Sequence, residues 1–521
     1  MEQYIVGIDA GGTFVKAGLF DARGRELAAA RELSPHSTVR GGRREQDPDA
    51  LWRAVCSSGR ALLRSSGIGA RDIAAISVTG YGSGLWLVDE HGVAVGNGIL
   101  STDVRTDVDT ESVVDEVTAA RVARLVSQRM WSGQTAALLR WFDKHEPAMR
   151  PRVHRVLACK DYIRSRLCGD MSTDHTDAGL TGLCDIERNS WSEDALGLLG
   201  ISQWRSSLPD IGSGAETVGV VTPEAAESTG FAVGTPVVRG VVDVVACAVA
   251  SRVLDETHMS VVAGTFGIDQ TLHRRPRTST SPLLQCRYVT GETYLASEGG
   301  ITSASNLEWC CRQILRHSVD ETVAGGDMYR RCDEAVARAY ARDRPTGMMF
   351  FPYLFGGPNG APAGLLGAVA EDGFDDTALA VYEGIVHAHK ADIEVLLGGD
   401  DAARPTAVRM SGGASRSSIW PQIFADALGL RVDVADSGEI GVRGAAITAA
   451  VAVGFFADFD SAASAFTPDV RSYEPDPRRV SAMRVRYDRH RALTTSLAAL
   501  WSGGDAVDDR YCDRSVVAAD A

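Results

Sequence analysis

The apolar and polar positions at the start of the chain alternate in short runs that predict a β-meander. Residues 4–9 are mostly apolar and end at Asp9, and a glycine turn separates them from a second apolar run, Phe14 to Phe20. A third strand-like run follows a polar turn and covers residues 26–32. Short apolar runs separated by glycine-containing and polar turns are typical of neighbouring antiparallel strands. We therefore expect a three-stranded sheet here.

After this meander the spacing of apolar positions changes to that of a helix. Apolar residues between positions 48 and 66 fall on one helical face. A strand at 74–80 then enters a glycine-rich loop and continues at 85–89, and residues 110–170 are mostly amphipathic helix. The first part of the chain is therefore predicted to be α/β.

A second cycle of strands and helices begins near the middle of the chain. Residues 235–242 are an apolar run, residues 243–254 have helical spacing, and residues 259–267 form a strand that ends in a glycine turn. The strand and small-residue turn of residues 5–13 thus recur about half a chain length later. Sequence similarity between the halves is weak, so the expected duplication is one of structure.

Length and composition indicate two large domains. A chain of 521 residues is too long for one ordinary domain. Its content of 45% hydrophobic and 23% charged residues is typical of a globular protein. We expect domains at 1–250 and 251–503, followed by a polar, poorly ordered tail at 504–521.

The net charge indicates which ligands the protein can bind, and the cysteine content indicates its redox compartment. The net charge of −15 argues against nucleic acid or an acidic membrane surface. It does not argue against ATP, because backbone amides and magnesium neutralise phosphates locally. The ten cysteines include no Cys-x-x-Cys pair and no cluster with zinc spacing, which predicts free thiols in a reducing compartment.

No apolar run approaches the roughly 18 residues that a membrane-spanning helix needs. The longest candidate, Ala445 to Phe456, is expected to be a buried helix. The first residues lack a basic segment followed by an apolar signal core. We therefore expect a soluble cytoplasmic protein.

The first candidate site is the turn from Asp9 to Lys16, with the sequence DAGGTFVK. Gly11 and Gly12 allow a tight turn whose bare amides approach an anion. Thr13 adds a hydroxyl donor, Lys16 is within reach of a phosphate if the hairpin directs it toward the turn, and Asp9 is placed to hold magnesium through water. The alternative is a plain hairpin that contains two glycines.

The second candidate is Gly264 with Thr265, just after the apolar strand of the second cycle. Taken alone this turn is a weak signal. Two such turns on opposite walls of a cleft would, however, hold a polyphosphate from both sides. The pair is therefore more informative than either member.

The third candidate is the strand–helix–strand unit at 408–434. Gly412 and Gly413 would let an adenine or ribose lie flat against the backbone. Ser415 and Ser418 are candidates both to cap the following helix, which is predicted to end at Gly429, and to donate to a nucleotide. An ordinary unit with a capped helix is the alternative.

Asp243 is the fourth candidate, because it is a carboxylate with apolar residues on both sides directly after an apolar strand. Burying such a group is costly unless it has a partner or a function. A general base for a sugar hydroxyl needs this kind of partly desolvated position. A helix N-cap would fit equally well, so the residues alone leave both interpretations open.

With these motifs in their order, the chain resembles the FGGY family of carbohydrate kinases, within the actin-like ATPase superfamily. The resemblance runs from residue 4 to about residue 500. It implies an α/β fold of two actin-like (ribonuclease H-like) domains, with a cleft for ATP and sugar between them. The segments that match the family's motifs are the first phosphate motif Asp9–Lys16, the second phosphate motif Gly264–Thr265, the adenosine motif Ser411–Gln422 with Gly412, Gly413, Ala414 and Ser415, and a closing pattern of Glu439, Gly441, Gly444, Ala445 and Ala446.

The resemblance also places Asp243 at the family's catalytic base, with Asp9 and Asp243 near magnesium. It implies ATP and Mg²⁺ as cofactors, a small sugar as substrate, and a homodimer. Domain closure around the substrates would limit futile ATP hydrolysis.

The segments at 80–106 and 130–147 are most similar to the L-xylulose kinase branch. In that comparison Gly82, Ser83, Asp103 and Arg105 belong to the sugar site, and Trp131 lines it. Arg105 has a second interpretation, in which it pairs with Asp103 and holds the loop.

Other substrates stay open: D-xylulose, D-ribulose, or a tetritol or pentitol such as erythritol. D-xylulose kinases usually carry a bulkier pair at Gly82–Ser83, Trp-Asn at Ser101–Thr102, and an amide residue at Val244, which argues against D-xylulose itself.

Two further positions depart from the family's pattern. Phe266 stands where many relatives have serine, and the segment 355–364 replaces a Gly-Glu-Arg-x-Pro segment. Two functions of other classes remain as rivals: a non-catalytic sugar-responsive regulator and an actin-like chaperone ATPase or filament subunit.

Overall fold

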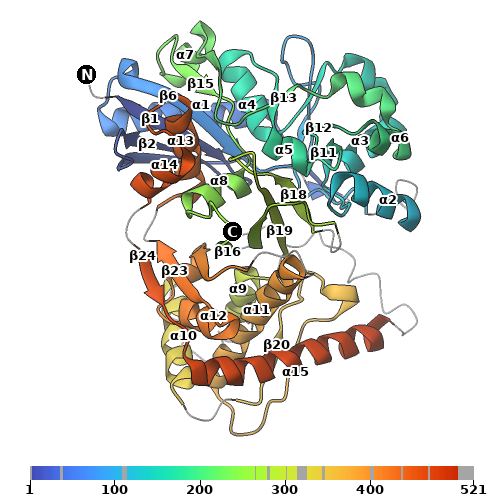
Figure 1. Ribbon diagram of the computed structural model, residues 1–521, viewed down its shortest axis with the longest axis vertical. Helices are drawn as coiled ribbons and strands as arrows, with labels where there is room; N and C mark the ends of the chain where they lie inside the picture. The colour runs from blue at the N-terminus through green and yellow to red at the C-terminus, as the bar shows by residue number, and fades with distance from the viewer. Residues whose placement is uncertain are drawn as a thin grey trace.

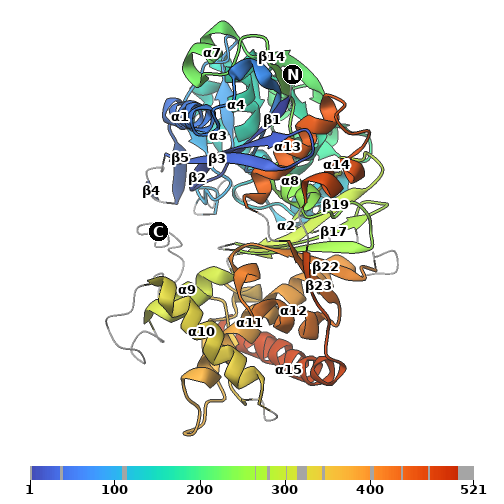
Figure 2. The same cartoon turned by 90° about the vertical axis from the view of Figure 1, so that its left-hand side faces the viewer.

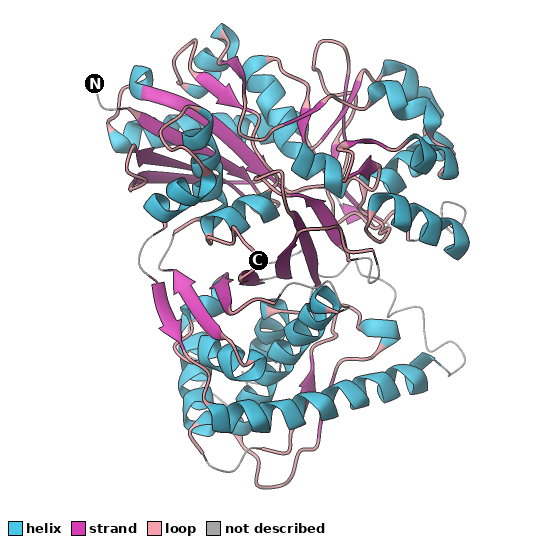
Figure 3. Ribbon diagram, viewed as in Figure 1, coloured by secondary structure: helices cyan, strands magenta, loops and turns pink. Residues whose placement is uncertain are grey.

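The computed structural model describes residues 3–502, apart from positions 36–38, 41, 108, 110–113, 265, 279–281, 301, 314–324, 343–345, 399–403, 436–437 and 468–469. The chain forms two lobes, one above the other in Figure 1, and each lobe is built on its own sheet. Helices flank both sheets, as Figure 3 shows. The predicted tail at 504–521 lies outside the described residues.

The sheet of the first lobe has six strands in the order β14-β15-β6-β1-β2-β3. Antiparallel pairing joins β1 to β2 and β2 to β3, which confirms the predicted meander. Next to β1, the strands β6 and β15 run parallel to it, and β14 closes the edge antiparallel. The strands are β1 (Tyr4–Ala10), β2 (Phe14–Asp21), β3 (Glu26–Leu33), β6 (Ile73–Gly80), β14 (Thr217–Val220) and β15 (Pro236–Val238).

The sheet of the second lobe has seven strands in the order β18-β19-β17-β16-β22-β23-β24. The meander is here β16, β17 and β19, and β22 and β23 run parallel to β16. The strands are β16 (His258–Ala263), β17 (Gly267–His273), β18 (Leu284–Arg287), β19 (Tyr294–Gly300), β22 (Ala407–Ser411), β23 (Arg431–Ala435) and β24 (Val470–Tyr473).

The two sheets therefore share one topology. In each, a three-stranded antiparallel meander is followed by two parallel strands and an antiparallel edge strand, and β18 is the additional strand of the second sheet. This match explains why a strand and turn recur at half the chain length. The expected structural duplication is present.

The helices before the second sheet are α1 (Pro48–Ser66), α2 (Glu116–Val126), α3 (Thr135–His145), α4 (Cys159–Cys168), α5 (His175–Leu180), α6 (Glu193–Leu198), α7 (Pro223–Thr229) and α8 (Asp243–Ala250). Those that follow are α9 (Ala304–Gln313), α10 (Gly325–Tyr340), α11 (Phe374–Leu397), α12 (Trp420–Leu428), α13 (Ile440–Ala452), α14 (Phe459–Phe466) and α15 (Pro477–Ser502). Short 3₁₀ helices cover Ala70–Asp72, Pro147–Arg152, Ser202–Ser207, Pro358–Gly360 and Gly413–Arg416. Minor strands are β4 (Val39–Arg40), β5 (Arg43–Gln46), β7 (Trp86–Val88), β8 (Gly98–Ile99), β9 (Arg155–Leu157), β10 (Thr173–Asp174), β11 (Cys184–Asp185), β12 (Ser190–Trp191), β13 (Ile211–Gly212), β20 (Met349–Phe351) and β21 (Gly364–Leu366).

Two helices from the second half of the chain belong to the first lobe in space. Figures 1 and 2 both show α13 and α14 beside β1 and α8. The backbones approach closely: a Cβ on Gly444 of α13 would lie 2.0 Å from the carbonyl oxygen of Ala246, and one on Gly7 would lie 2.1 Å from that of Val442. The predicted domain boundary after residue 250 coincides with the end of α8. The helices α13 and α14 come after this boundary in the sequence but pack in the first lobe.

The lobes are also joined by apolar packing. One cluster of buried residues combines Ile5 and Val245 of the first lobe with Leu272 of β17, Tyr288 just after β18, and Ile447 of α13. Of the run Ala445–Phe456, predicted to be a buried helix, residues 445–452 belong to α13, and residues 453–456 follow the helix end and are not buried. Among the described residues, no helix is both long and apolar enough to cross a membrane. The nine cysteines in the described part of the chain are free thiols.

Candidate active site

The first glycine turn connects β1 to β2 at the end of the first sheet. It is closed by a hydrogen bond from the Gly11 amide to the carbonyl of Phe14, at 3.0 Å, and Gly12 and Thr13 are exposed. Asp9 and Lys16 face each other across the hairpin as register partners. The turn therefore presents bare amides with one carboxylate and one ammonium group behind them.

Lys16 has a partner that lies 423 positions away in the sequence. Its Nζ donates to Oε2 of Glu439, just before α13, at a distance of 2.7 Å. Asp9 is close to the same helix, because a Cβ on Gly441 would lie 2.6 Å from its Oδ2. The family's closing pattern thus meets the first turn directly.

Asp243 is the first residue of α8, and its carboxylate accepts a hydrogen bond from the Val244 amide at 2.6 Å. The N-cap position is occupied by Val242. Asp243 therefore does not take the capping position, and the N-cap interpretation is wrong.

Asp9 and Asp243 are both buried carboxylates with raised pKa values. Burial, with a smaller contribution from the Asp9 charge, raises the pKa of Asp243 to about 7, against the opposing Val244 amide. Burial raises the pKa of Asp9 to about 6, where Lys16 opposes the rise and Glu439 adds to it. Buried carboxylates with raised pKa values are common at sites that handle protons or cations.

This donor set fits magnesium. Mg²⁺ is usually held by one or two carboxylates together with water and substrate phosphates, rather than by an all-protein cage. Asp9 and Asp243 supply two carboxylates, and the described residues contain no cluster of three or more His, Cys, Asp or Glu that could hold a metal.

The second glycine turn follows β16, in the position that the first turn takes after β1. The Gly264 amide bonds to the Phe266 carbonyl at 3.2 Å, and the Ala304 amide at the start of α9 donates to the Gly264 carbonyl at 2.9 Å. Phe266 is 41% exposed. Thr265, predicted as a phosphate ligand, lies outside the described residues.

The adenosine segment packs directly on this second turn. Gly412 has a φ of 88°, and a Cβ there would lie 2.6 Å from the carbonyl oxygen of Ala263. Gly413 is exposed with open space where a Cβ would be, while Ala414 and Ser415 are buried. The structure therefore brings the second phosphate motif and the adenosine motif together.

The expected helix caps in this segment need correction. Ser415 Oγ donates to the Gly412 carbonyl at 2.8 Å. It is Ser417 whose Oγ accepts from the Trp420 amide, at 3.0 Å, at the start of α12. The amide of Ser418 donates to Asp333 on α10, which Ser417 also contacts. Ser415 and Ser418 were expected as caps because serine favours that position, but the chain bends so that Ser417 faces the helix start. The end of α12 at Gly429 is as predicted.

The predicted sugar loop follows β6 and is mostly buried. Ser83 is 3% exposed, has a φ of 59°, and donates to the Leu180 carbonyl at 3.0 Å. A Cβ on Gly82 would lie 2.6 Å from Val242, the neighbour of Asp243. Gly82 therefore brings this loop against the start of α8.

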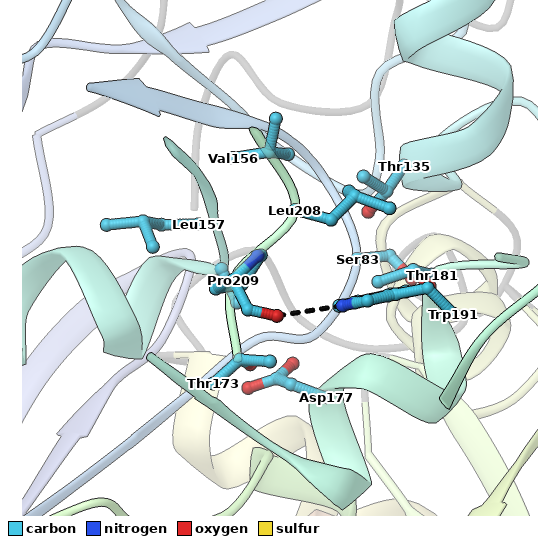
Figure 4. A pocket seen from close by; sticks show the side chains of 11 residues that line it. Ser83, Thr135, Val156, Leu157, Thr173, Asp177, Thr181, Trp191, Leu208 and Pro209 are labelled. Carbon is cyan, nitrogen blue, oxygen red and sulfur yellow. Dashed lines mark hydrogen bonds between the residues drawn. The ribbon is translucent and has the colours of Figure 1, made fainter. Parts of the chain in front are cut away.

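A small cavity lies behind the sugar loop (Figure 4). Its volume is about 20 Å³, and its lining includes Ser83, Thr135, Thr173, Asp177 and Trp191. A volume of this size accommodates one water molecule. The cavity is too small for a pentulose and is therefore not by itself a sugar site.

Asp103 and Arg105 bond to each other rather than facing outward. Asp103 is fully buried and receives the Arg105 Nε at 2.9 Å and Nη2 at 2.8 Å, as well as the amides of Arg44 and Arg105. Arg105 also donates to Glu45 at 2.8 Å, and its guanidinium lies 4.9 Å from the Trp141 ring centroid. This arrangement favours the loop-holding interpretation that the sequence left open.

The two tryptophans near the loop differ in environment. Trp86 is 1% exposed and stacks on Tyr162, with ring centroids 4.8 Å apart, so it packs in the core. Trp131 is only partly buried, and its indole N–H has no hydrogen-bond partner within the described structure. The indole N–H of Trp86 also has no partner among the described residues, so the two tryptophans differ in exposure and not in hydrogen bonding.

Two buried polar clusters were not predicted from the sequence. Beneath the sugar loop, the ammonium group of Lys160 lies 2.6, 3.0 and 3.1 Å from the carboxylates of Asp161, Asp174 and Asp177. Beneath the second turn, His389 lies between Asp269 and Ser303. The spacing KDY–TDHTD at 160–177 was the only available signal for the first cluster. The second has none, because its members are more than thirty positions apart.

Residues 4–250 match the N-terminal domain of the FGGY family of carbohydrate kinases, and residues 259–453 match its C-terminal domain. The chain belongs to the FGGY family of carbohydrate kinases. It is 30% identical to the L-xylulose/3-keto-L-gulonate kinase of Escherichia coli (strain K12), covering 95% of this chain and 98% of that protein. Identity is also 30% to the probable L-xylulose kinase of Pasteurella multocida (strain Pm70), over 95% and 99% of the two chains.

The fold of this FGGY kinase is that of the actin-like ATPases. The crystal structure of xylulose kinase from Lactobacillus acidophilus superimposes with a TM-score of 0.86 at 21% identity, covering 96% of this chain and 99% of the other. The predicted fold class is confirmed. The protein is a sugar kinase, so neither the regulator nor the chaperone alternative applies.

Proposed function

We propose that this kinase transfers the γ-phosphoryl group of ATP to a terminal hydroxyl of a small sugar, with L-xylulose or a similar pentulose as the best candidate. The observation that carries the proposal is Asp243. Its carboxylate is buried, its pKa is raised to about 7, and it is near enough to Asp9 for the Asp9 charge to contribute to that rise. A general base is most effective when its pKa lies near the working pH.

The nucleotide is proposed to bind between the two turns. The exposed amides around Gly12 and the Thr13 hydroxyl would contact phosphate from the first lobe, and Gly264 with Thr265 from the second. Gly412 to Ser415 would support the adenosine, since Gly413 leaves open space above the backbone. Lys16 would exchange Glu439 for a phosphate oxygen, because exposed ion pairs of this kind are weak.

Asp243 would accept the proton of the attacking hydroxyl as it approaches the γ-phosphorus. Asp9 and Asp243 would hold magnesium, which when bound neutralises charge on the phosphates. Phosphoryl transfer requires little covalent work from the protein, so positioning and electrostatics supply most of the rate. The partly desolvated position of both carboxylates is suited to this role.

On the sugar side, we propose that the Asp103–Arg105 pair acts mainly by holding the loop, while Trp131 and the backbone around Gly82 and Ser83 face the sugar. The two bacterial relatives named above support a pentulose, as does the small side chain at position 83. D-xylulose, D-ribulose and tetritols or pentitols such as erythritol remain the alternatives. A homodimer and a cytoplasmic location stay predictions.

A coupled assay of ADP release tests the proposal. The purified protein would be supplied with MgATP and, one at a time, L-xylulose, D-xylulose, D-ribulose, erythritol, xylitol and 3-keto-L-gulonate. We expect sugar-dependent turnover with the largest kcat/KM for L-xylulose. If kcat/KM is highest for erythritol or xylitol, the substrate class is a polyol and not a pentulose. ATP hydrolysis that no sugar stimulates would overturn the proposed function.

A further inference from the structure

Three buried side chains beneath the second glycine turn form one hydrogen-bonded chain, which we name the relay. The imidazole of His389 on α11 lies between Asp269 on β17 and Ser303 just before α9. Its Nδ1 is 3.0 and 2.9 Å from the two carboxylate oxygens of Asp269, and its Nε2 is 3.0 Å from Ser303 Oγ. None of the three residues is more than 2% exposed.

The relay joins the two elements that anchor the turn. On one side, β17 begins at Gly267, where the turn ends, and Asp269 is the third residue of that strand. On the other side, Ala304, the neighbour of Ser303, donates its amide to the Gly264 carbonyl at 2.9 Å. The imidazole therefore connects both anchors with a single rigid ring.

The ring also supports the turn by direct contact. A Cβ on Gly267 would lie 2.8 Å from His389 Cε1 and 3.0 Å from the Ser303 Cβ. The Phe424 ring packs edge-on against the other side of the imidazole, with centroids 5.3 Å apart. His389 is thus fixed between α12 and the turn, and a displacement of the ring would be transmitted to the backbone at Gly267.

Charged groups around the relay strengthen it. Burial alone would lower the pKa of His389, but the Asp269 carboxylate outweighs burial and holds the pKa above its ordinary value. Burial raises the pKa of Asp392, on the same helix, to about 8, with the charges of Asp269 and, more weakly, Glu298 adding to the rise. Glu298 on β19 is paired in turn with Arg129 at 2.8 Å. The hydrogen bond between His389 and Asp269 is therefore charge-assisted, which makes it one of the stronger kinds.

A nucleophilic role for this serine, histidine and aspartate does not fit the structure. Ser303 is fully buried. A substrate carbonyl therefore has no access to its hydroxyl, and the geometry points to a structural link rather than to a reaction centre.

We propose that His389 is a positioning residue for the nucleotide: through Asp269 and Ser303 it fixes the second glycine turn in the conformation that contacts the phosphates. This inference rests on the proposed function, in which that turn holds ATP. It predicts that the relay affects nucleotide affinity, and that it leaves sugar affinity in the other lobe nearly unchanged.

The test compares three variants of the full-length protein. His389→Phe keeps an aromatic ring and removes both hydrogen bonds. His389→Gln offers one amide N–H to Asp269 and one carbonyl to Ser303. His387→Phe is the matched control, because His387 is a buried histidine on the same helix that packs on His490 and Tyr487 instead. Calorimetric titration with MgADP gives the Kd, and steady-state kinetics give the KM for the sugar.

We expect His389→Phe to raise the Kd for MgADP about ten-fold, a change of about 1.4 kcal/mol, with the sugar KM within about two-fold of wild type. His389→Gln should recover most of the affinity. His387→Phe should bind MgADP like wild type, even if its melting temperature falls.

Three results would overturn the inference: unchanged affinity in His389→Phe, equal losses in His387→Phe and His389→Phe, or no recovery in His389→Gln. The readout separates this inference from the proposed function. A wild-type protein that binds MgADP but phosphorylates no sugar of the panel would contradict the proposed function, while the comparison of the three variants would still decide the role of His389.

Discussion

Each lobe has a glycine at the end of the parallel strand that pairs with the first strand of its meander. In the first lobe β6 ends at Gly80, where a Cβ would lie 3.2 Å from the Ala10 carbonyl oxygen at the end of β1. In the second lobe β22 leads to Gly412, which approaches Ala263 at the end of β16 even more closely. The backbone plan of turn and loop is thus the same in both halves.

What differs is the location of charge. The first turn is surrounded by Asp9, Lys16 and Asp243, together with Glu439 from α13. The second turn, residues 264–267, contains no charged residue, and the charged groups of the relay are buried beneath it. We infer that the first lobe supplies the chemistry and the second lobe holds the nucleotide. Two lobes with the same backbone topology can therefore perform different tasks because their charged residues lie at different positions.

The replacement of Asp243 by Asn should give the largest effect. Asn keeps the size of the side chain and removes the base, so kcat should fall at least ~100-fold. The Kd for MgADP should stay within about two- to three-fold of wild type, because the turns are unchanged. Steady-state kinetics and calorimetry measure the two quantities.

Asp194→Asn, at the exposed first turn of α6, is the control for the same chemical change. It should retain wild-type kcat. If Asp243→Asn phosphorylates sugar within ten-fold of the wild-type rate, Asp243 is not the base and the first lobe does not supply the chemistry as described.

The sequence was sufficient for those parts of the site that depend on local order. Short apolar runs bounded by glycine and polar turns predicted β1, β2 and β6, since both the run and its turn residues are local in the sequence. Asp243 was recognised because a carboxylate between apolar residues conflicts with its surroundings. The glycine turns were recognised for a similar reason, since adjacent glycines give flexibility that a plain strand does not need.

The remaining parts depend on contacts between distant residues and could not be predicted. No local pattern shows that Lys16 meets Glu439, or that α13 crosses to the first lobe. The direction of the Arg105 side chain depends on Trp141 and Glu45, which belong to other elements. Burial of His389 follows from tertiary packing, because the sequence of α11 does not show that His389 faces Asp269 while His387, two positions earlier, faces His490 and Tyr487.

Arg105→Met should cause the next largest effect, a loss of about 3 kcal/mol in the free energy of unfolding of the first lobe. The change leaves the buried Asp103 carboxylate without its cation, and breaking a buried pair is strongly destabilising. Urea unfolding measures the loss. Arg25→Met is the control, because Arg25 pairs with Asp21 on the surface, with 77% of its side chain exposed.

Arg25→Met should change stability by less than about 1 kcal/mol. If Arg105→Met is equally mild and instead raises only the sugar KM, then Arg105 binds the sugar directly and the loop-holding interpretation is wrong.

Acid should weaken the second lobe before the first. Burial lowers the pKa of His490 to about 4, and its Nε2 bonds to the Phe350 carbonyl at 3.0 Å. The folded pKa is below the ordinary value of 6.5, so the unfolded chain binds the proton first. This group's contribution to stability is therefore complete above about pH 6.5 and is lost as the pH falls toward 4. Between pH 7 and pH 5 the loss should be about 2 kcal/mol.

Urea unfolding at pH 7 and pH 5 checks this prediction in wild type, His490→Phe and His91→Gln. His490→Phe is less stable at pH 7 but should lose about 2 kcal/mol less than wild type on acidification. His91, with 76% of its side chain exposed, should leave the pH dependence unchanged when replaced. An unchanged pH dependence in His490→Phe would show that other groups account for acid sensitivity.

The smallest expected effect concerns the contact between the adenosine segment and the second turn. Gly412→Ala places a methyl group 2.6 Å from the Ala263 carbonyl oxygen at a φ of 88°, and it should cost about 1 kcal/mol of stability. Gly413→Ala is matched in chemistry and differs by one position, where the structure has open space around the Cβ. Thermal unfolding should therefore show a lower Tm for Gly412→Ala than for Gly413→Ala. If the two variants melt together, the close approach of Gly412 to Ala263 does not hold the segment, and the second lobe lacks the fixed nucleotide platform that distinguishes it from the first.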